Sequence, residues 1–424
     1  MKEEFLHYIW QYQQFDKSAL KTTSNTEISI LKQGLLNTDS GPDFKEARVK
    51  IDHLEWVGSV EIHLKSSDWL RHNHQQDSAY DNVILHVVWQ HDKEITGKDG
   101  KALPTLELAA LTNQNIIDKY KSLVLSPATV PCSSDFHKVD DIIKMSMLDK
   151  ALMQRLQRKA KVVLKRLASN LGDWEETVYQ VLLGNFGFKL NNHAFVHLAE
   201  NIPLKLLRKY SSSEIQTQAL LYGVAGFLNA QDDEYALKLK KEYTFLRAKH
   251  GLEERELNIS EWKFLRTRPA NFPTVRLAEI AALISRQKSF FDVFTETADF
   301  KEIEAYFKSA LSVYWREHYH FGKKSARPQN GLGKSSIHNL IINTVVPVLI
   351  AYGSYTDEQS KTDRAISFLE EIPAERNRIT RLWESLDLEI KTMSDSQGSI
   401  ELYNEFCTKR QCLSCGVGVN LMKV

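Results

Sequence analysis

Charged side chains at two-residue spacing mark the first part of the chain. Glu61, His63 and Lys65 alternate with apolar residues, and Asp43 precedes another alternating segment. Because alternate residues of a β-strand project from one face, Glu61, His63 and Lys65 are expected on the same face. Asp43, at the entry of a neighbouring strand, would meet Glu61 there. Two converging carboxylates suit Mg²⁺ or Mn²⁺, which activates water and neutralises charge on a phosphoryl group.

The elements that must position these residues follow from periodicity. Apolar residues at helical spacing predict a helix over 3–15, and a second helix is expected over 67–79. The nearly continuous apolar run of 82–90 predicts a central strand that is buried on both faces. The expected strands cover 27–36, 46–53, 56–65, 82–90 and 102–109, the last returning from a hairpin turn at 97–100.

The order helix, strand, strand, strand, helix, strand resembles the PD-(D/E)XK nuclease superfamily over about residues 1–110. The resemblance rests on Pro42-Asp43 at the entry of the second strand and on Glu61 in the third. It implies that Asp43 and Glu61 bind the metal and that a lysine orients the attacking water. Here His63 stands where that lysine should be. Lys65, one pleat further along, would supply the cation, or His63 would act as a base or ligand.

The chain as a whole resembles a bacterial family of unknown function, domain-of-unknown-function family 2851. The resemblance is carried by SGPDF at 40–44, GSVEIHLKSSDW at 58–69 and HNHQQDSAYDNVILHVVW at 72–89. RPANFPTVRLAEIA at 268–281 and the cysteine-rich tail support it. The resemblance implies no activity.

Histidines are concentrated in the same region. His72 and His74 either lie at the rim of the site, contacting phosphate or a second metal, or belong to a polar helix face. His86 alternates with Ile84 and Val88, so it is expected to be buried and hydrogen-bonded within its strand. The full set is His53, His63, His72, His74, His86 and His91.

Three of the four cysteines fall within nine residues near the end of the chain. Cys407, Cys412 and Cys415 could join Cys132 in one four-cysteine site for zinc or an iron–sulfur cluster. Some nucleases of the superfamily named above carry such a cluster. The alternative is four reduced thiols with no shared ligand. A redox-active pair is less favoured, because the CxxC motif does not open a helix after a strand.

Composition excludes several classes of protein. Hydrophobic residues make up 42% of the 424 residues and charged residues 26%, which is typical of a globular chain rather than a disordered one. Helical periodicity dominates from about residue 140. The sequence predicts an α+β fold: a PD-(D/E)XK-like mixed sheet with flanking helices over 1–135, an all-helical region over 136–395 and a Cys-rich segment over 396–424.

Charge gives little information about partners. The net charge is +1, so a nucleic-acid surface would have to be a local patch, such as the basic face expected on a helix over 151–168. No segment approaches ~18 consecutive apolar residues, so no membrane span is expected. The first residues lack the pattern of a signal peptide, and a cytoplasmic location is the expectation.

These observations favour a metal-dependent nuclease that hydrolyses phosphodiester bonds in DNA or RNA, with Asp43, Glu61, His63 and Lys65 in its active site. One alternative is a nuclease-fold module that has lost catalysis and binds nucleic acid or a protein. A third is a metalloenzyme acting on another substrate through its histidines. A metal held chiefly by His63, His72 and His74 would favour the third.

Overall fold

The structure is a computed structural model that describes residues 1–423, apart from residues 38, 99, 230–231, 266 and 309. The chain separates into two compact units, each with its own core. Unit 1 comprises residues 1–148, 382–388 and 401–424, and unit 2 comprises residues 149–381 and 389–400. Three of the four boundaries fall within the helices α4 (Asp141–Ser169), α17 (Arg378–Glu384) and α18 (Met393–Glu401), and the fourth lies between Leu388 and Glu389.

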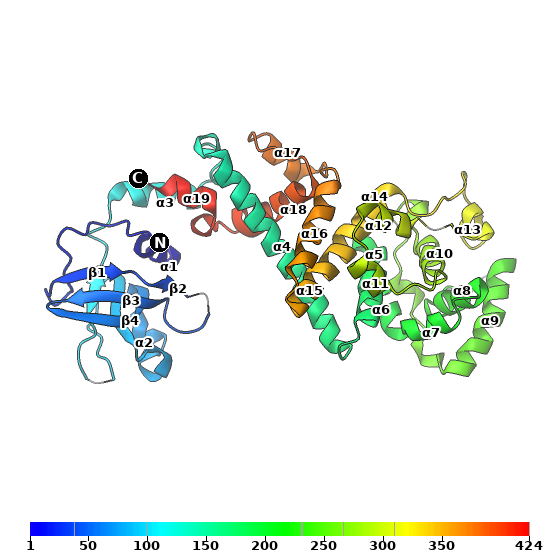
Figure 1. Ribbon diagram of the computed structural model, residues 1–424, viewed down its shortest axis with the longest axis horizontal. Coiled ribbons are helices and arrows are strands. Elements are labelled where there is room, and N and C mark those ends of the chain that lie inside the picture. The colour runs from blue at the N-terminus through cyan, green and yellow to red at the C-terminus, as the bar shows by residue number, and fades with distance from the viewer. Residues whose placement is uncertain (38, 99, 230–231, 266, 309, 424) are drawn as a thin grey trace. The chain divides into compact units, whose positions relative to one another are not determined.

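Unit 1 contains a mixed sheet in the strand order β1-β3-β4-β5-β6, with the short β2 also paired to β3 (Figure 1). The strands β1 to β4 pair antiparallel, whereas β4, β5 and β6 run parallel. The apolar β5 therefore lies between β4 and β6, which confirms the prediction of a central strand. The strands are β1 (Ile28–Lys32), β2 (Leu35–Leu36), β3 (Phe44–Ile51), β4 (Leu54–Lys65), β5 (Val83–Gln90) and β6 (Thr105–Glu107).

The pairing of β3 with β4 fixes the faces of the two acidic residues. Phe44 pairs with Val60, so Asp43 and Glu61 follow directly opposite each other. Residues that oppose each other in an antiparallel pair share a face. Phe44 and Val60 are fully buried on one face, and Asp43 and Glu61 therefore project together from the other.

Several elements differ from the sequence prediction. The expected strand over 27–36 is divided into β1 and β2, and the expected helix over 3–15 ends at Gln11. The segment 102–109 does not return as a hairpin partner of β5, because β6 pairs with β5 in parallel. The expected turn itself forms, because the N–H of Gly97 donates to the carbonyl of Lys101 and the N–H of Gly100 to that of Gly97, and Thr96 bridges antiparallel to Ala102. Asp99 in that turn lies outside the described residues. The expected helix over 67–79 is also shorter. It ends at Arg71 as α2 (Asp68–Arg71) and continues as the 3-10 turns η1 (His74–Gln76) and η2 (Ser78–Tyr80).

The other helices of unit 1 are α1 (Glu3–Gln11), α3 (Gln114–Val124) and α19 (Gly416–Met422). Helix α1 contacts β4. It buries Phe5, Leu6, Ile9 and Trp10, which recur at helical spacing, while Glu3 and Glu4 lie in its first turn. The cysteine-rich tail belongs to this unit, since α19 contacts α3.

Unit 2 is almost entirely helical (Figure 1). One hydrophobic core of buried residues joins its helices. Within its described residues the helices are α5 (Trp174–Phe186), α6 (Phe188–Asn201), α7 (Leu204–Lys209), α8 (Glu214–Val224), α9 (Glu234–His250), α10 (Pro273–Ile284), α11 (Phe290–Glu296), α12 (Phe300–Phe307), α13 (Val313–Glu317), α14 (Lys334–Leu340), α15 (Val346–Thr356) and α16 (Gln359–Glu371), with a two-stranded sheet of β7 (His318–His320) and β8 (Lys323–Lys324).

Two features of unit 2 bear on whether it contacts a membrane or nucleic acid. The continuous helix Lys334–Thr356 is long and apolar enough to cross a membrane by length and composition, but it is 72% buried in the protein, as a core helix would be. Three of the basic residues of α4 have partners within unit 2. Arg155 donates to Gln397, Lys159 to Asn343, and Arg166 to Gln180 and Glu200.

Candidate metal-binding active site

The carboxylates of Asp43 and Glu61 each accept a hydrogen bond from a backbone N–H in the other residue's segment. The N–H of Asp43 donates to Oε2 of Glu61 at 3.1 Å, and the N–H of Ile62 donates to Oδ2 of Asp43 at 3.0 Å. Each carboxylate therefore has one oxygen that takes no part in these two hydrogen bonds. The structure brings these two predicted site residues together on one face of the sheet.

Glu61 lies in an environment that disfavours its negative charge. The side chain is 6% exposed. Burial, followed by the charge of Asp43, raises the pKa of Glu61 to about 9, although the N–H of Asp43 opposes the shift. A cation beside Glu61 would remove this penalty, because an opposite charge favours the ionised form.

His63 is held as a neutral imidazole. Burial, followed by the nearby His86, lowers the pKa of His63 to about 2. Its Nδ1 is 2.9 Å from Nε2 of His86, which confirms that His86 is buried and hydrogen-bonded. Burial also lowers the pKa of His86 to about 3. A neutral imidazole is the form that binds a metal, and a hydrogen bond to its second nitrogen fixes the ring for ligation.

The break after α2 brings two further imidazoles to the same place. Asn73 adopts a left-handed conformation with φ of 60°, which ends the helical path and turns η1 back. Nδ1 of His72 then lies 3.2 Å from Nε2 of His63, and Nε2 of His74 lies 3.3 Å from Oε1 of Glu61. Among the described residues, His63, His72 and His74 are the one group whose ligand atoms all lie within 4.8 Å of one another.

Three of the separations among these ligand atoms are close to the edge of a coordination tetrahedron. Metal–ligand bonds of 2.0–2.1 Å at tetrahedral angles place neighbouring ligand atoms about 3.3 Å apart. The third measured edge, from Nε2 of His63 to Oε1 of Glu61, is 3.6 Å. Nε2 of His74 is buried and makes no hydrogen bond within the described part of the chain, despite its approach to Glu61. The three imidazoles therefore lie close enough together to share a cation, and Glu61 lies beside two of them.

Helix α1 adds two residues that the sequence analysis missed. Nε2 of His7 lies 3.2 Å from Oδ2 of Asp43. Burial lowers the pKa of His7, but the hydrogen bond with Asp43 and the charges of Asp43, Glu3 and Glu4 outweigh it and raise the pKa overall. Burial, followed by electrostatic repulsion from Asp43, raises the pKa of Glu3. The i,i+4 spacing of Glu3 and His7 on an expected helix was the available signal.

Lys65 occupies a different position from the other predicted residues. Its side chain is exposed, and its backbone N–H donates to Oδ2 of Asp68 at 3.1 Å. Burial raises the pKa of Asp92, but hydrogen bonds from Ser67 and Ser66 outweigh burial and lower that pKa overall. The charge of Lys65 adds to the lowering. His63, not Lys65, lies beside Glu61.

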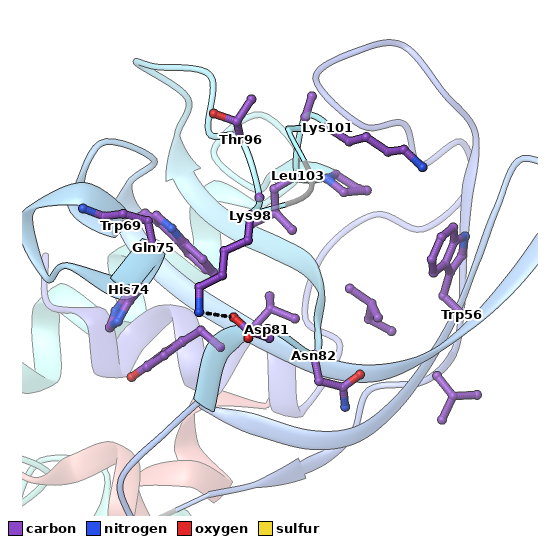
Figure 2. Close-up of a pocket in the computed structure, with 17 residues that line it drawn as sticks. Trp56, Trp69, His74, Gln75, Asp81, Asn82, Thr96, Lys98, Lys101 and Leu103 are labelled. Carbon is purple, nitrogen blue, oxygen red and sulfur yellow. Dashed lines mark ion pairs between the residues drawn. The ribbon is translucent and has the colours of Figure 1, made fainter. Parts of the chain in front are cut away.

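A pocket of about 660 Å³ opens beside these histidines. His74 belongs to its lining and stacks on Tyr80, with ring centroids 3.8 Å apart. Figure 2 shows Trp69, His74 and Gln75 on one side of the pocket and Trp56 on the other. The pocket therefore shares a wall with the histidine group.

The four cysteines are buried within unit 1 and form no disulfide. Burial, followed by the neighbouring Cys415 and Cys412, raises the pKa of Cys132 to about 12. Burial and Cys415 also raise the pKa of Cys412 to about 11, and the pKa of Cys407 is raised by burial and by the other three. The pKa of each of these thiols is therefore raised in part by neighbouring thiols. No three of the sulfur atoms of these described residues lie within 4.8 Å of one another.

The fold and the site define a mixed α/β protein whose N-terminal sheet carries a histidine- and carboxylate-lined centre. Residues 3–378 match the family described as "Protein of unknown function (DUF2851)", and the chain belongs to that family. This confirms the resemblance carried by the motifs of the whole chain. No curated protein and no solved structure matches the chain.

Proposed function

We propose that unit 1 is a metal-dependent hydrolase with its metal held by His63, His72, His74 and Glu61. This ligand set is the one expected of a metalloenzyme that acts through its histidines, and the acidic pair of Asp43 and Glu61 favours phosphodiester bonds of nucleic acid as the substrate over other substrates. The proposal is carried by the convergence of these four side chains at separations of 3.2, 3.3 and 3.6 Å. Imidazole ligands suit Zn²⁺ or Mn²⁺ better than Mg²⁺, which prefers oxygen ligands. The Mg²⁺ expected from the sequence is therefore replaced by a transition metal in the proposal.

The substrate class is supported by the position of the acidic pair. Asp43 stands at the entry of β3 and Glu61 within β4, as the PD-(D/E)XK resemblance requires, and helices precede and follow these strands. The bound metal would supply an activated water and stabilise charge on the phosphoryl group. Asp43 lies 3.2 Å from His7, whose raised pKa keeps a proton available for a leaving oxygen.

Cleavage assays on single- and double-stranded DNA and RNA with Mg²⁺, Mn²⁺ or Zn²⁺ test the proposal. Glu61→Gln should abolish cleavage, whereas Lys65→Ala should retain most of it, because Lys65 is exposed and His63 lies beside Glu61. Loss of cleavage in Lys65→Ala would favour the superfamily's lysine-dependent chemistry. No cleavage with any of these metals would favour the alternative of a non-catalytic binding module.

We propose in addition that Cys132, Cys407, Cys412 and Cys415 hold an iron–sulfur cluster. A single zinc ion with bonds of about 2.3 Å would draw four sulfurs into a tight tetrahedron. The thiols are buried and electrostatically coupled, but they are spaced more widely than the three imidazoles. A cluster holds its cysteine sulfurs further apart, because the iron and sulfide atoms lie between them.

A further inference from the structure

We propose that the pocket beside the histidine group binds one unpaired base of a nucleic-acid strand. This inference rests on the proposed function and specifies its substrate as single-stranded or locally unpaired. At about 660 Å³ the pocket lies within the range typical of small-molecule sites and is large enough for a nucleotide.

Two residues that line the pocket, Trp69 and Gln75, each carry a buried polar atom without a hydrogen-bond partner in the described structure. Trp69 is buried, and its Nε1 has no hydrogen-bond partner within the described structure. Oε1 of Gln75 is likewise buried without a donor among the described residues. Buried polar groups are normally paired, since leaving one unpaired costs about 1–3 kcal/mol. A ligand that reaches these two atoms would have to carry an acceptor for Trp69 and a donor for Gln75, and a nucleobase edge carries both.

Aromatic rings supply surfaces on which a base can stack. Trp56 lines the side opposite Trp69 and remains 46% exposed, which is unusual for an indole that serves only the core (Figure 2). Bases stack on such rings whatever their identity. Lys101 also lines the pocket, and Lys98 there pairs with Asp81 at 2.7 Å. The lining therefore combines aromatic walls with cations.

The position of the pocket links binding to chemistry. His74 lines the pocket and approaches Glu61 at 3.3 Å, so a bound base lies next to the proposed metal ligands. A base within a duplex is covered on both faces and paired at its edge, so it can enter only after it leaves the stack. Single strands should therefore be preferred.

The test measures binding of the full chain to a single-stranded DNA oligonucleotide containing 2-aminopurine, with EDTA present to prevent cleavage. Trp56→Ala should weaken binding roughly five- to a hundredfold and reduce the quenching of 2-aminopurine. Trp69→Phe keeps an apolar ring but removes the N–H, and it should also weaken binding. Leu54→Ala is the matched control, because Leu54 is 63% exposed on the same strand and does not line the pocket.

Wild-type affinity in both tryptophan variants would overturn the inference, as would failure of the wild type to bind the oligonucleotide or equal affinity for a duplex. Thermal unfolding of Trp69→Phe checks that a loss of binding does not reflect unfolding. The two proposals fail differently. Binding that depends on Trp56, without cleavage under any metal, would refute the hydrolase alone. Cleavage with an unchanged KM in Trp56→Ala and Trp69→Phe would refute the pocket alone.

Discussion

Nε2 of His74 lies 3.3 Å from Oε1 of Glu61, although the two residues are on different elements and the imidazole makes no hydrogen bond within the described structure. A left-handed residue, Asn73, directs His74 to this place. The proposed cation would lie between these two atoms. The relationship leads to predictions about metal affinity, stability and pH.

Removal of a proposed ligand should weaken metal binding. His74→Ala is expected to lower the affinity for Zn²⁺ or Mn²⁺ at least tenfold, since a ligand should matter no less than the second-shell groups for which such losses are typical. Isothermal titration of metal-free protein measures the effect. His53→Ala is the matched control, because the side chain of His53 is 92% exposed. Equal affinities in the two variants would remove His74 from the centre.

His86 should act on the metal through His63. If Nε2 of His63 binds the cation, its Nδ1 carries the proton and donates to Nε2 of His86 at 2.9 Å. His86→Leu should then lower metal affinity roughly 10- to 100-fold. The absorption spectrum of bound Co²⁺ should change as well, because the orientation of the His63 ring is no longer fixed. A His86→Leu variant that folds and keeps both properties would contradict this role.

The metal-free protein should become less stable as pH rises, because of Glu61. Its pKa is about 9 in the folded chain against an ordinary value of 4.5, so the unfolded chain loses its proton first. The stability present below the lower value is lost progressively toward the upper one. Glu61→Gln should remove this loss, so its Tm should exceed that of the wild type increasingly between about pH 5 and pH 9.

The matched control for that measurement is Glu46→Gln, because the side chain of Glu46 is 70% exposed. Its Tm should follow the wild type at every pH. Addition of Zn²⁺ should restore the wild type at high pH, since the cation favours the ionised carboxylate. Parallel Tm profiles for Glu61→Gln and the wild type in EDTA would refute the assigned environment of Glu61.

Substitution of a cysteine in the tail should lower both the stability of the protein and its iron content. Cys412→Ser is expected to lower Tm and the iron content of protein purified without oxygen, because one ligand of the proposed cluster would be removed. Thr408→Ser, an exposed change in the same tail, should alter neither. Elemental analysis that finds zinc instead would favour a single-ion site, and an unchanged Tm with no metal would leave four unlinked thiols.

A glycine of α19 should tolerate no side chain. A Cβ at Gly418 would lie 2.1 Å from the carbonyl oxygen of Cys412, so Gly418→Ala should cost at least about 1–3 kcal/mol of stability. At Gly416, two residues earlier, the nearest atom would be the Cβ of Met147 at 3.8 Å, and Gly416→Ala should be nearly neutral. Denaturant unfolding compares the two variants. Equal stabilities would mean that the tail does not pack as described.

Local patterns in the sequence were sufficient for part of this protein. Alternation placed Glu61 and His63 on one strand face, because a β-strand repeats every two residues regardless of its surroundings. The apolar run of 82–90 marked the central strand β5 for the same kind of reason, since a strand covered on both faces needs apolar residues at nearly every position. The family motifs are likewise a property of the sequence.

Only the tertiary structure decided how these elements meet. Helical spacing extended α2 through His74, whereas the folded chain breaks at Asn73, because contacts with the sheet outweigh a weak local preference. Three other features depend on residues far apart in the sequence. They are the approach of Glu3 and His7 to Asp43, the parallel pairing of β6 with β5, and the burial of Cys132 near the tail cysteines. The sequence determined which ligands are available, and long-range packing decided which of them converge.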